Sequence, residues 1–191
     1  SPYNKTWFYD GKKDSNRIEG NNIFTTYPEG FENIGYKTIA AFEMLLDYDF
    51  DYLFRPNSSS FVNVPKLIEF LGAAPSEKYY SGSAIPYHGG GIDLIGRTNN
   101  DPHLCCSGCG YILSRDLVEL IVKNKEEWEH RLIDDLAICN FLKKYNVDMI
   151  ESPRLKVFRA IDGKIFGERS EVSHEEILKH FHITTRAAEY D

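Results

Sequence analysis

Apolar residues recur at helical spacing in several parts of this chain. In residues 35–47 they fall at Ile39, Phe42, Leu45 and Leu46, the three-to-four-residue period that puts side chains on one face of a helix. We therefore predict a helix there. By the same pattern and by the capping residues that precede them, further helices are predicted at residues 63–71, 115–124, 134–145 and 174–181.

Short apolar and aromatic stretches bounded by turn residues predict the strands. They lie at residues 5–9, 21–27, 50–54, 78–86 and 103–114, and further short strands are expected from Val147 on. The last stretch, HLCCSGCGYILS, has glycines near its centre, and we expect two strands joined by a glycine turn. Strands and helices alternate along most of the chain. This predicts an α/β fold, a single domain over residues 1–191 with a central twisted, mostly parallel or mixed sheet flanked by helices.

Residues 86–103 contain four glycines and two prolines and predict a long loop. Long loops in compact domains are commonly functional, so we expect this one to shape a binding site.

The balance of charge excludes some partners. The chain has 29 acidic and 22 basic residues and a net charge of −7, whereas nucleic-acid and anionic-membrane surfaces need clustered lysine and arginine. No apolar run reaches the length of a membrane span, and no basic-then-apolar N-terminus indicates a signal peptide. We therefore expect no nucleic-acid partner and no membrane span.

Three of the four cysteines, Cys105, Cys106 and Cys109, lie within five residues, and Cys139 lies farther along. Such crowding is a poor disulfide framework, and cysteines along one strand are typically buried thiols. We expect reduced cysteines and hence a reducing compartment. A zinc site of His103 with two of these cysteines is the alternative, but it lacks a second CxxC pair.

Four segments occur in an order that resembles a known family. They are EGFENIGYKTIAAFEMLL (29–46), FDYLFRPNSSSFVNVPKLIEFL (50–71), CCSGCGYILSRDLVELI (105–121) and IDDLAICNFLKK (133–144). With this order the chain resembles the GT-A glycosyltransferases of the Fringe and β-1,3-galactosyl- or N-acetylglucosaminyltransferase type and their bacterial and viral relatives. The resemblance implies a GT-A fold and an inverting enzyme. Such an enzyme moves a sugar from a nucleotide-sugar donor, here a UDP-sugar, to a saccharide or other hydroxyl acceptor.

The second segment departs from the family at the aspartate triplet. That triplet holds a divalent metal, Mn²⁺ or Mg²⁺, against the donor diphosphate, whereas this chain has Asn57, Ser58 and Ser59. An amide and two hydroxyls supply no negative charge for a hard cation. One account is that Lys37, Arg55 and a helix N-terminus neutralise the diphosphate beside this triplet. The others are a weak metal site with a distant histidine, and a GT-A-like domain that binds saccharide or protein without catalysis.

Two aspartates open the predicted helix at residues 134–145. Inverting sugar transfer needs one general base beside the acceptor hydroxyl, and the resemblance assigns that role to Asp135, with Asp134 in the acceptor pocket. Carboxylates in a first turn also complement the helix dipole, so one of the pair can serve stability instead. A nucleotidyltransferase is a third alternative, but no pair of metal-binding carboxylates is evident for it.

The resemblance also places a sugar and acceptor pocket along the glycine-rich segment. Its members would be Ser107, Gly108, Cys109, Gly110 and Tyr111, with Gly82 from a neighbouring strand end. Small residues let a ligand approach the backbone, and Tyr111 could stack on a sugar face. Close packing of strands explains the same glycines equally well.

The C-terminal segment HFHITTRAAEYD offers His182 and Arg186. The family often ends with a histidine that completes the metal site or touches the diphosphate, and His182 is the match. The planar guanidinium of Arg186 suits a phosphate.

The family begins with a strand and loop that grip the nucleotide base, whereas only a few residues precede KTWFYDG here. We expect that strand to be absent or trimmed, with Trp7, Tyr9 and Asp10 forming what is left of the base pocket. With no signal peptide in view and reduced cysteines, the expected location is the cytoplasm of a bacterium or of a virus-infected host. A trimmed lumenal domain of the Golgi is the alternative.

Overall fold

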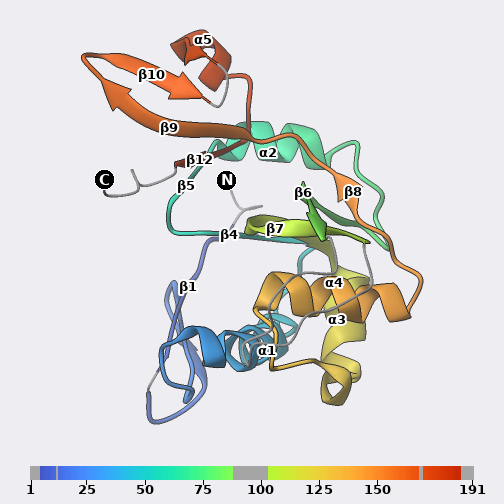
Figure 1. Cartoon of the computed structure of the whole chain (residues 1–191). Helices are drawn as coiled ribbons and strands as arrows, with labels where there is room; N and C mark the ends of the chain where they lie inside the picture. The colour runs from blue at the N-terminus through green and yellow to red at the C-terminus, as the bar shows by residue number, and fades with distance from the viewer. Residues whose placement is uncertain (1–4, 12, 88–102, 168–169, 186–191) are drawn as a thin grey trace.

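The computed structural model describes residues 5–11, 13–87, 103–167 and 170–185 (Figure 1). Most of the loop predicted at residues 86–103 lies outside these residues, and so does Arg186.

A four-stranded sheet forms the middle layer of the fold, in the order β4–β7–β6–β8. Its strands are β4 (Tyr52–Pro56), β6 (Tyr80–Tyr87), β7 (His103–Ser114) and β8 (Ile150–Glu151). The long strand β7 pairs antiparallel with both β4 and β6, and β6 pairs parallel with β8. The predicted α/β class is confirmed, and of the two sheet types predicted the mixed one is observed.

Three helices cover one face of this sheet: α1 (Ile34–Leu45), α3 (Arg115–Lys123) and α4 (Asp134–Lys144) (Figure 1). The core between helices and sheet is built from apolar side chains that are almost completely buried, among them Leu113, Val118, Ile138, Phe141 and Leu142. Since these residues fix α4 against β7, the first turn of α4 is held beside this inner strand of the sheet.

The other face carries helix α2 and a five-stranded sheet of order β11–β10–β9–β12–β5 (Figure 1). The elements are β5 (Ser60–Val62), α2 (Val64–Leu71), β9 (Leu155–Ile161), β10 (Lys164–Gly167), β11 (Glu171–Val172), α5 (His174–Ile177) and β12 (His182–Thr185). Strand β12 lies between β5 and β9, pairing antiparallel with the first and parallel with the second. This return brings the C-terminal segment beside the turn that follows β4.

A small N-terminal sheet packs against α1. It consists of β1 (Phe8–Asp10), β2 (Arg17–Glu19) and β3 (Asn22–Phe24), with β3 in the middle. Ile23 contacts the α1 residues Ala41 and Leu45 in a separate apolar cluster. Two short 3-10 turns, Phe31–Asn33 and Lys125–Glu127, complete the described elements.

The helices predicted from apolar spacing are confirmed, although the last one is only four residues long. The prediction of a glycine turn inside residues 103–114 is wrong, because β7 runs through the whole segment and forms a bulge instead. Strands β2 and β5 were not predicted. Each is only three residues long, too short for a periodic pattern to develop.

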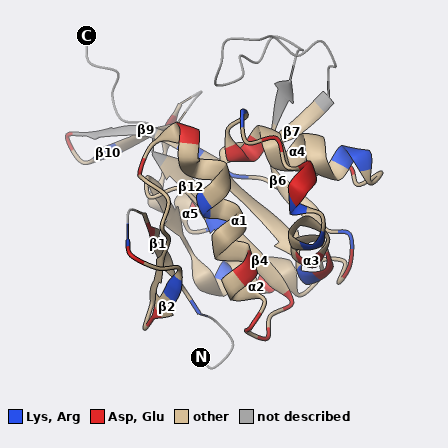
Figure 2. Ribbon diagram, turned by 90° about the horizontal axis from the view of Figure 1, so that it is seen from below, with Lys and Arg blue, Asp and Glu red and all other residues tan. Residues whose placement is uncertain are grey.

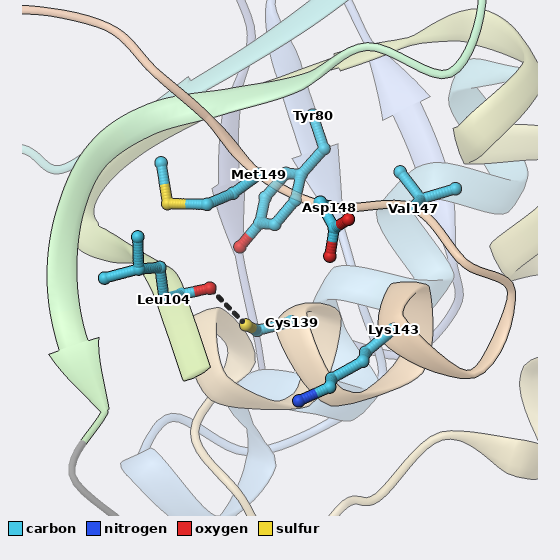
Figure 3. A pocket seen from close by; sticks show the side chains of 7 residues that line it. All are labelled: Tyr80, Leu104, Cys139, Lys143, Val147, Asp148 and Met149. Atoms are coloured by element: carbon cyan, nitrogen blue, oxygen red, sulfur yellow. Dashed lines mark hydrogen bonds between the residues drawn. The ribbon is translucent and has the colours of Figure 1, made fainter. Parts of the chain in front are cut away.

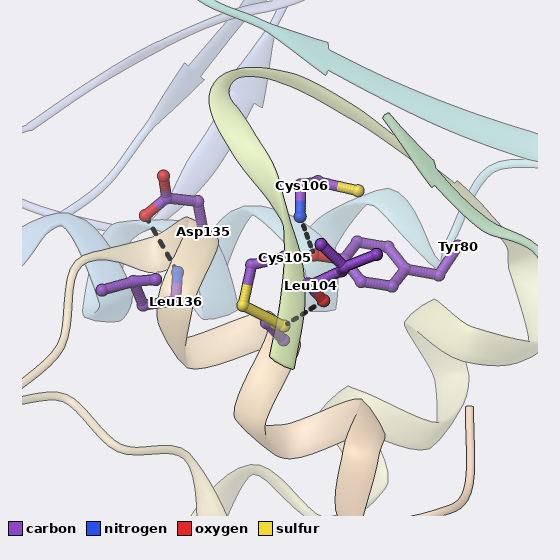
Figure 4. The surroundings of a disulfide bond; sticks show 7 residues. Tyr80, Leu104, Cys105, Cys106, Asp135 and Leu136 are labelled. Carbon is purple, nitrogen blue, oxygen red and sulfur yellow. Dashed lines mark hydrogen bonds between the residues drawn. A yellow bond between two sulfur atoms is a disulfide. The ribbon is translucent and has the colours of Figure 1, made fainter. Parts of the chain in front are cut away.

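The prediction of reduced cysteines is also wrong for two of the four. Cys105 of β7 and Cys139 of α4 form a disulfide with their Cα atoms 5.5 Å apart, while Cys106 and Cys109 are free. Figure 4 shows the bond joining the strand to the helix about one turn after Asp135. Burial raises the pKa of the Cys106 thiol to about 12, so this thiol stays protonated and unreactive.

Acidic and basic segments are interspersed along the ribbon in Figure 2. Among the described residues, no helix combines the length and the apolar character needed to cross a membrane.

Candidate active site

The candidate site is organised around a bulge in β7. Tyr111 pairs with Gly82 and Cys106 pairs with Ala84, so residues 107–110 of β7 lie opposite the single residue Ser83. Bulges of this kind bend a strand and re-aim its side chains, and they are common beside active sites. The bulge contains four of the residues predicted to line the sugar and acceptor pocket.

Gly82 serves the packing of this bulge. A Cβ atom at Gly82 would lie 2.8 Å from the Cys106 Sγ atom and 2.9 Å from the Gly110 carbonyl oxygen. No side chain fits in that space, so the missing side chain of Gly82 lets two strands approach each other. Of the two explanations for this glycine, close strand packing is the one that these distances support.

The turn that carries the replaced triplet closes onto the bulge. The Asn57 N–H donates to the Cys109 carbonyl oxygen over 3.0 Å, and the Ser60 hydroxyl donates to the same oxygen over 3.2 Å. Ser58 and Ser59 are exposed between these anchors. The segment RPNSSSF is therefore a turn pinned to the glycine-rich strand, with two hydroxyl-bearing residues facing outward.

Arg55 links this turn to the start of α4. One guanidinium nitrogen, Nη1, donates to the Gly108 carbonyl oxygen over 3.2 Å and to Asn57 Oδ1 over 3.3 Å. The other, Nη2, lies 2.9 Å from Asp134 Oδ2 and 3.1 Å from the Tyr9 hydroxyl. The Arg55 guanidinium is thus bound by one carboxylate through Nη2 and by neutral oxygens of the turn and the bulge through Nη1.

The two aspartates of α4 have different surroundings. Asp134 is 3% exposed and is bound by Arg55 and by the Tyr111 hydroxyl, 3.4 Å away. Asp135 is 6% exposed, and its Oδ1 atom accepts from the Leu136 N–H over 2.9 Å. A Cβ atom at Gly108 would lie 2.8 Å from Asp135 Oδ2, so only a glycine allows the bulge to approach this carboxylate.

The surroundings of Asp135 make its carboxylate basic. Burial and the neighbouring Asp134 charge raise the pKa of Asp135 to about 6, although backbone hydrogen bonds from Leu136 and Gly108 oppose the shift. Burial also raises the pKa of Asp134, and the Arg55 charge acts in the opposite direction. Asp135 is therefore ionised at neutral pH while its proton affinity lies close to that of a useful general base.

Tyr111 packs beneath the side chains of Arg55 and Asp134. Its side chain is completely buried, with the Arg55 guanidinium 5.7 Å from the ring centroid. A buried ring offers no face to a sugar, so Tyr111 contributes by holding Asp134 and Arg55 rather than by stacking.

His182 reaches the same turn from β12. Its Nε2 atom lies 3.1 Å from the Ser60 hydroxyl, and its ring packs edge-on against Phe54. Burial, and secondly the charge of Arg154, lower the pKa of His182 to about 4. The imidazole is therefore neutral at physiological pH. A Cβ atom at Gly110 would lie 2.8 Å from the His182 ring, so the bulge contacts the histidine as closely as it contacts Asp135.

Lys37 is not joined directly to the turn by any described contact. Its Nζ atom lies 2.6 Å from Glu29 Oε2 and 5.0 Å from the centroid of the Tyr9 ring. The lysine is buried, and its charge is balanced by Glu29. It packs against Tyr9, which in turn bonds to Arg55. The role expected for Tyr9 in the base pocket stays a prediction.

Arg154 lies near the site and was not predicted. Its Nη1 atom donates to the Ser107 hydroxyl over 3.1 Å, and that hydroxyl also accepts from the Cys109 N–H over 3.3 Å. The arginine lies between β8 and β9 in a segment without a motif, so no sequence pattern indicates that it joins the bulge.

The donor groups around the turn do not fit a divalent metal. Within the described residues no cluster of histidine, cysteine, aspartate and glutamate could hold one. The oxygens nearest His182 belong to neutral groups, and Arg55 donates to Asn57. A hard dication prefers anionic oxygens and is repelled by neighbouring cations.

A separate pocket of about 220 Å³ lies beside the disulfide (Figure 3). It is lined by Tyr80, Leu104, Cys139, Lys143, Val147, Asp148 and Met149. None of the predicted site residues belongs to this set, so the pocket is distinct from the cluster around the bulge.

Comparison with known proteins confirms the resemblance to β-1,3-glycosyltransferases. The chain is 25% identical over 158 residues to the UDP-GalNAc:β-1,3-N-acetylgalactosaminyltransferase 1 of Homo sapiens, a match that covers 75% of this chain and 47% of the relative. It is 27% identical over 141 residues to the β-1,3-galactosyltransferase 1 of Mus musculus, covering 65% and 42%. The chain thus spans about half the length of the curated relatives it matches. No family model matches it.

These relatives overturn the expected cytoplasmic location. They are Golgi glycosyltransferases, and the Cys105–Cys139 disulfide is a bond of oxidising compartments. The expectation relied on reduced cysteines, which two of the four are not. The similarity and the disulfide therefore both argue against the expected cytoplasmic location.

Proposed function

We propose that this chain is the catalytic domain of an inverting glycosyltransferase, which moves a sugar from a UDP-sugar to a hydroxyl of a saccharide acceptor. The observation that carries the proposal is the position of Asp135. It is a buried, basic carboxylate at the first turn of α4, in contact with a glycine bulge. The proteins similar to this chain include a transferase named for UDP-GalNAc and another named for galactosyl transfer.

In this reaction Asp135 is the general base. The acceptor oxygen attacks the anomeric carbon of the donor sugar, and its proton passes to the Asp135 carboxylate. The bond between the anomeric carbon and the phosphate oxygen breaks on the opposite face, and UDP leaves with the bonding electrons. Attack from the face opposite the leaving group inverts the configuration of the sugar.

Asp134 is unsuited to this role because its charge is already used. It is ion-paired with Arg55 at 2.9 Å and accepts from Tyr111. Asp135 has no cationic partner among the described residues, and the contacts of its carboxylate are with backbone groups. We therefore assign orientation to Asp134, which fixes Arg55 beneath the turn, and proton abstraction to Asp135.

The test is turnover with defined donors. The chain is incubated with UDP-GalNAc or UDP-galactose and a panel of saccharides, and both UDP release and product mass are measured. We expect UDP release that requires a saccharide and a product heavier by one sugar residue. Release of pyrophosphate would indicate nucleotidyl transfer instead, and no release with any donor and acceptor would contradict the proposal.

A second candidate is a domain that binds saccharides without catalysis. The observation that favours it is the turn at Asn57, Ser58 and Ser59, which lacks the carboxylates of the family's triplet. This candidate predicts that saccharides bind with no UDP release, and that replacing Asp135 has no effect on binding. The same assay therefore separates the two functions.

A further inference from the structure

One cation beside the bulge, Arg154, differs from the other cations of the site in its partners. Arg154 is half-buried, and the one hydrogen bond described for it goes to the neutral Ser107 hydroxyl. Among the residues that the structure describes, no carboxylate forms an ion pair with it. A half-buried charge without a counter-charge is costly in the free protein, and a bound anion removes that cost.

Two of the cations predicted for the diphosphate, Lys37 and Arg55, are already paired. Lys37 lies 2.6 Å from Glu29, and Arg55 lies 2.9 Å from Asp134. An anion would have to compete with a carboxylate for either of them, with the exposed Glu29 for Lys37 and with the buried Asp134 for Arg55. Arg154 therefore differs from both in having its charge available.

The position of Arg154 also fits. Its backbone is anchored two residues earlier, where the Ser152 N–H donates to the Gly82 carbonyl oxygen over 2.8 Å. Its side chain donates to Ser107 at the start of the bulge. Its charge helps to lower the pKa of His182, which contacts Ser60 of the turn. Arg154 thus lies beside the bulge, which the family resemblance associates with the sugar and acceptor, and near His182, which it associates with the metal or the diphosphate.

We propose that Arg154 binds the diphosphate of the donor and replaces the divalent metal at this site. This inference rests on the proposed function and deepens it, because it names the group that neutralises the leaving UDP. The guanidinium donates to phosphate oxygens in a planar fork, while the neutral His182 and the turn hydroxyls supply uncharged contacts. As the bond to the sugar breaks, this fixed positive charge stabilises the negative charge that develops on the diphosphate.

The test is calorimetric titration of the 191-residue chain with UDP in EDTA. We compare the wild type with Arg154→Ala, Arg154→Lys and the control Lys125→Ala. The control removes one positive charge from an exposed pair with Glu43, on a 3-10 turn outside the site. Thermal unfolding of each variant shows whether it is folded.

We expect the wild type to bind UDP without metal. Arg154→Ala should raise the dissociation constant by about ten- to a hundredfold, which corresponds to the loss of a hydrogen bond to a charged group. Arg154→Lys should recover part of the loss, and Lys125→Ala should leave the affinity unchanged. Binding should also weaken with salt, and less steeply in Arg154→Ala. A merely structural role for Arg154 would lower the melting temperature without changing this salt dependence.

Two results would overturn the inference and leave the proposed function standing: UDP affinity that is unchanged in folded Arg154→Ala, or UDP binding that appears only when Mn²⁺ is added. Absence of UDP binding both in EDTA and in Mn²⁺ would overturn the inference and the proposed function together.

Discussion

The two sides of the β7 bulge carry opposite kinds of chemistry. On one side, the start of α4 keeps two buried aspartates, and a disulfide ties the same helix to β7. On the other side, the turn after β4 carries Asn57, Ser58 and Ser59, beside a neutral His182. Proton abstraction needs a carboxylate with a raised pKa, whereas holding a diphosphate needs only positive charge. Under the proposed function, the comparison teaches that diphosphate binding can pass from a metal to another cation, whereas proton abstraction still requires the aspartate.

Replacing the base should have the largest effect. We expect Asp135→Asn to lower the rate of sugar transfer by about 10²- to 10⁴-fold, because the proton of the acceptor loses its carrier. Rates of UDP release under saturating donor measure this directly. A variant that retains the wild-type rate would show that the base lies elsewhere.

The same variant should be no less stable than the wild type at pH 7.5. The pKa of Asp135 is higher in the folded chain than in the unfolded chain. The Asp135 carboxyl therefore stabilises the fold fully below its unfolded pKa, and this stabilisation is lost as the pH rises through about 6. An uncharged asparagine avoids the burial of charge above that pH, and we expect a gain of about 1–3 kcal/mol in the free energy of unfolding.

Replacing the neighbouring aspartate should act on stability first. Asp134→Ala leaves the guanidinium of Arg55 without its counter-charge, and breaking a buried pair in this way costs about 3–5 kcal/mol. Urea denaturation measures the loss. Glu176→Ala, which breaks an exposed pair with Lys179, is the matched control and should cost less than about 1 kcal/mol. Equal losses in the two variants would contradict the structural role of Asp134.

The pH dependence should separate the two sides of the bulge. Below pH 6 the rate should fall by about tenfold per pH unit, since the carboxylate of Asp135 becomes protonated. Binding of the intact UDP-sugar should stay nearly constant over the same range, because arginine does not titrate there. Parallel pH profiles of rate and of donor affinity provide the measurement. An affinity that falls together with the rate would show that a titrating group also holds the donor.

Restoring a carboxylate to the turn should have the smallest effect. We expect Asn57→Asp to weaken UDP binding in EDTA by about fivefold, as the new charge repels the diphosphate and competes for Arg55, 3.3 Å away. Calorimetry measures the change, with Asn63→Asp at the cap of α2 as a control that adds the same charge elsewhere. Tighter binding of UDP by Asn57→Asp without metal would contradict the account.

Much of the fold could be predicted from the sequence, since the helices α1 and α4 show clear apolar periodicity. The β7 bulge could not, because glycines beside Cys109 suit a tight turn as well as a bulge, and the choice depends on the strands on either side. Cys139 could not be recognised as a disulfide partner, because sequence does not specify pairing and three crowded cysteines suggested thiols.

The site was predicted unevenly for a similar reason. Asp134, Asp135, Arg55 and the glycine-rich segment lie close together, as expected from the order of the motifs. Arg154 belongs to no motif and is brought to Ser107 only by the path of the chain between β8 and β9. Its role depends on which cations remain unpaired, and pairing is a property of the folded chain.

The most direct test of the central claim is the rate of UDP release from a UDP-sugar in the presence of a saccharide acceptor, measured first in EDTA and then with Mn²⁺. The account predicts release in EDTA at a rate that Mn²⁺ does not raise, because fixed arginine charge takes the place of the metal. Release that occurs only after Mn²⁺ is added would contradict it, and would mean that the turn at Asn57 holds a metal despite its lack of carboxylates.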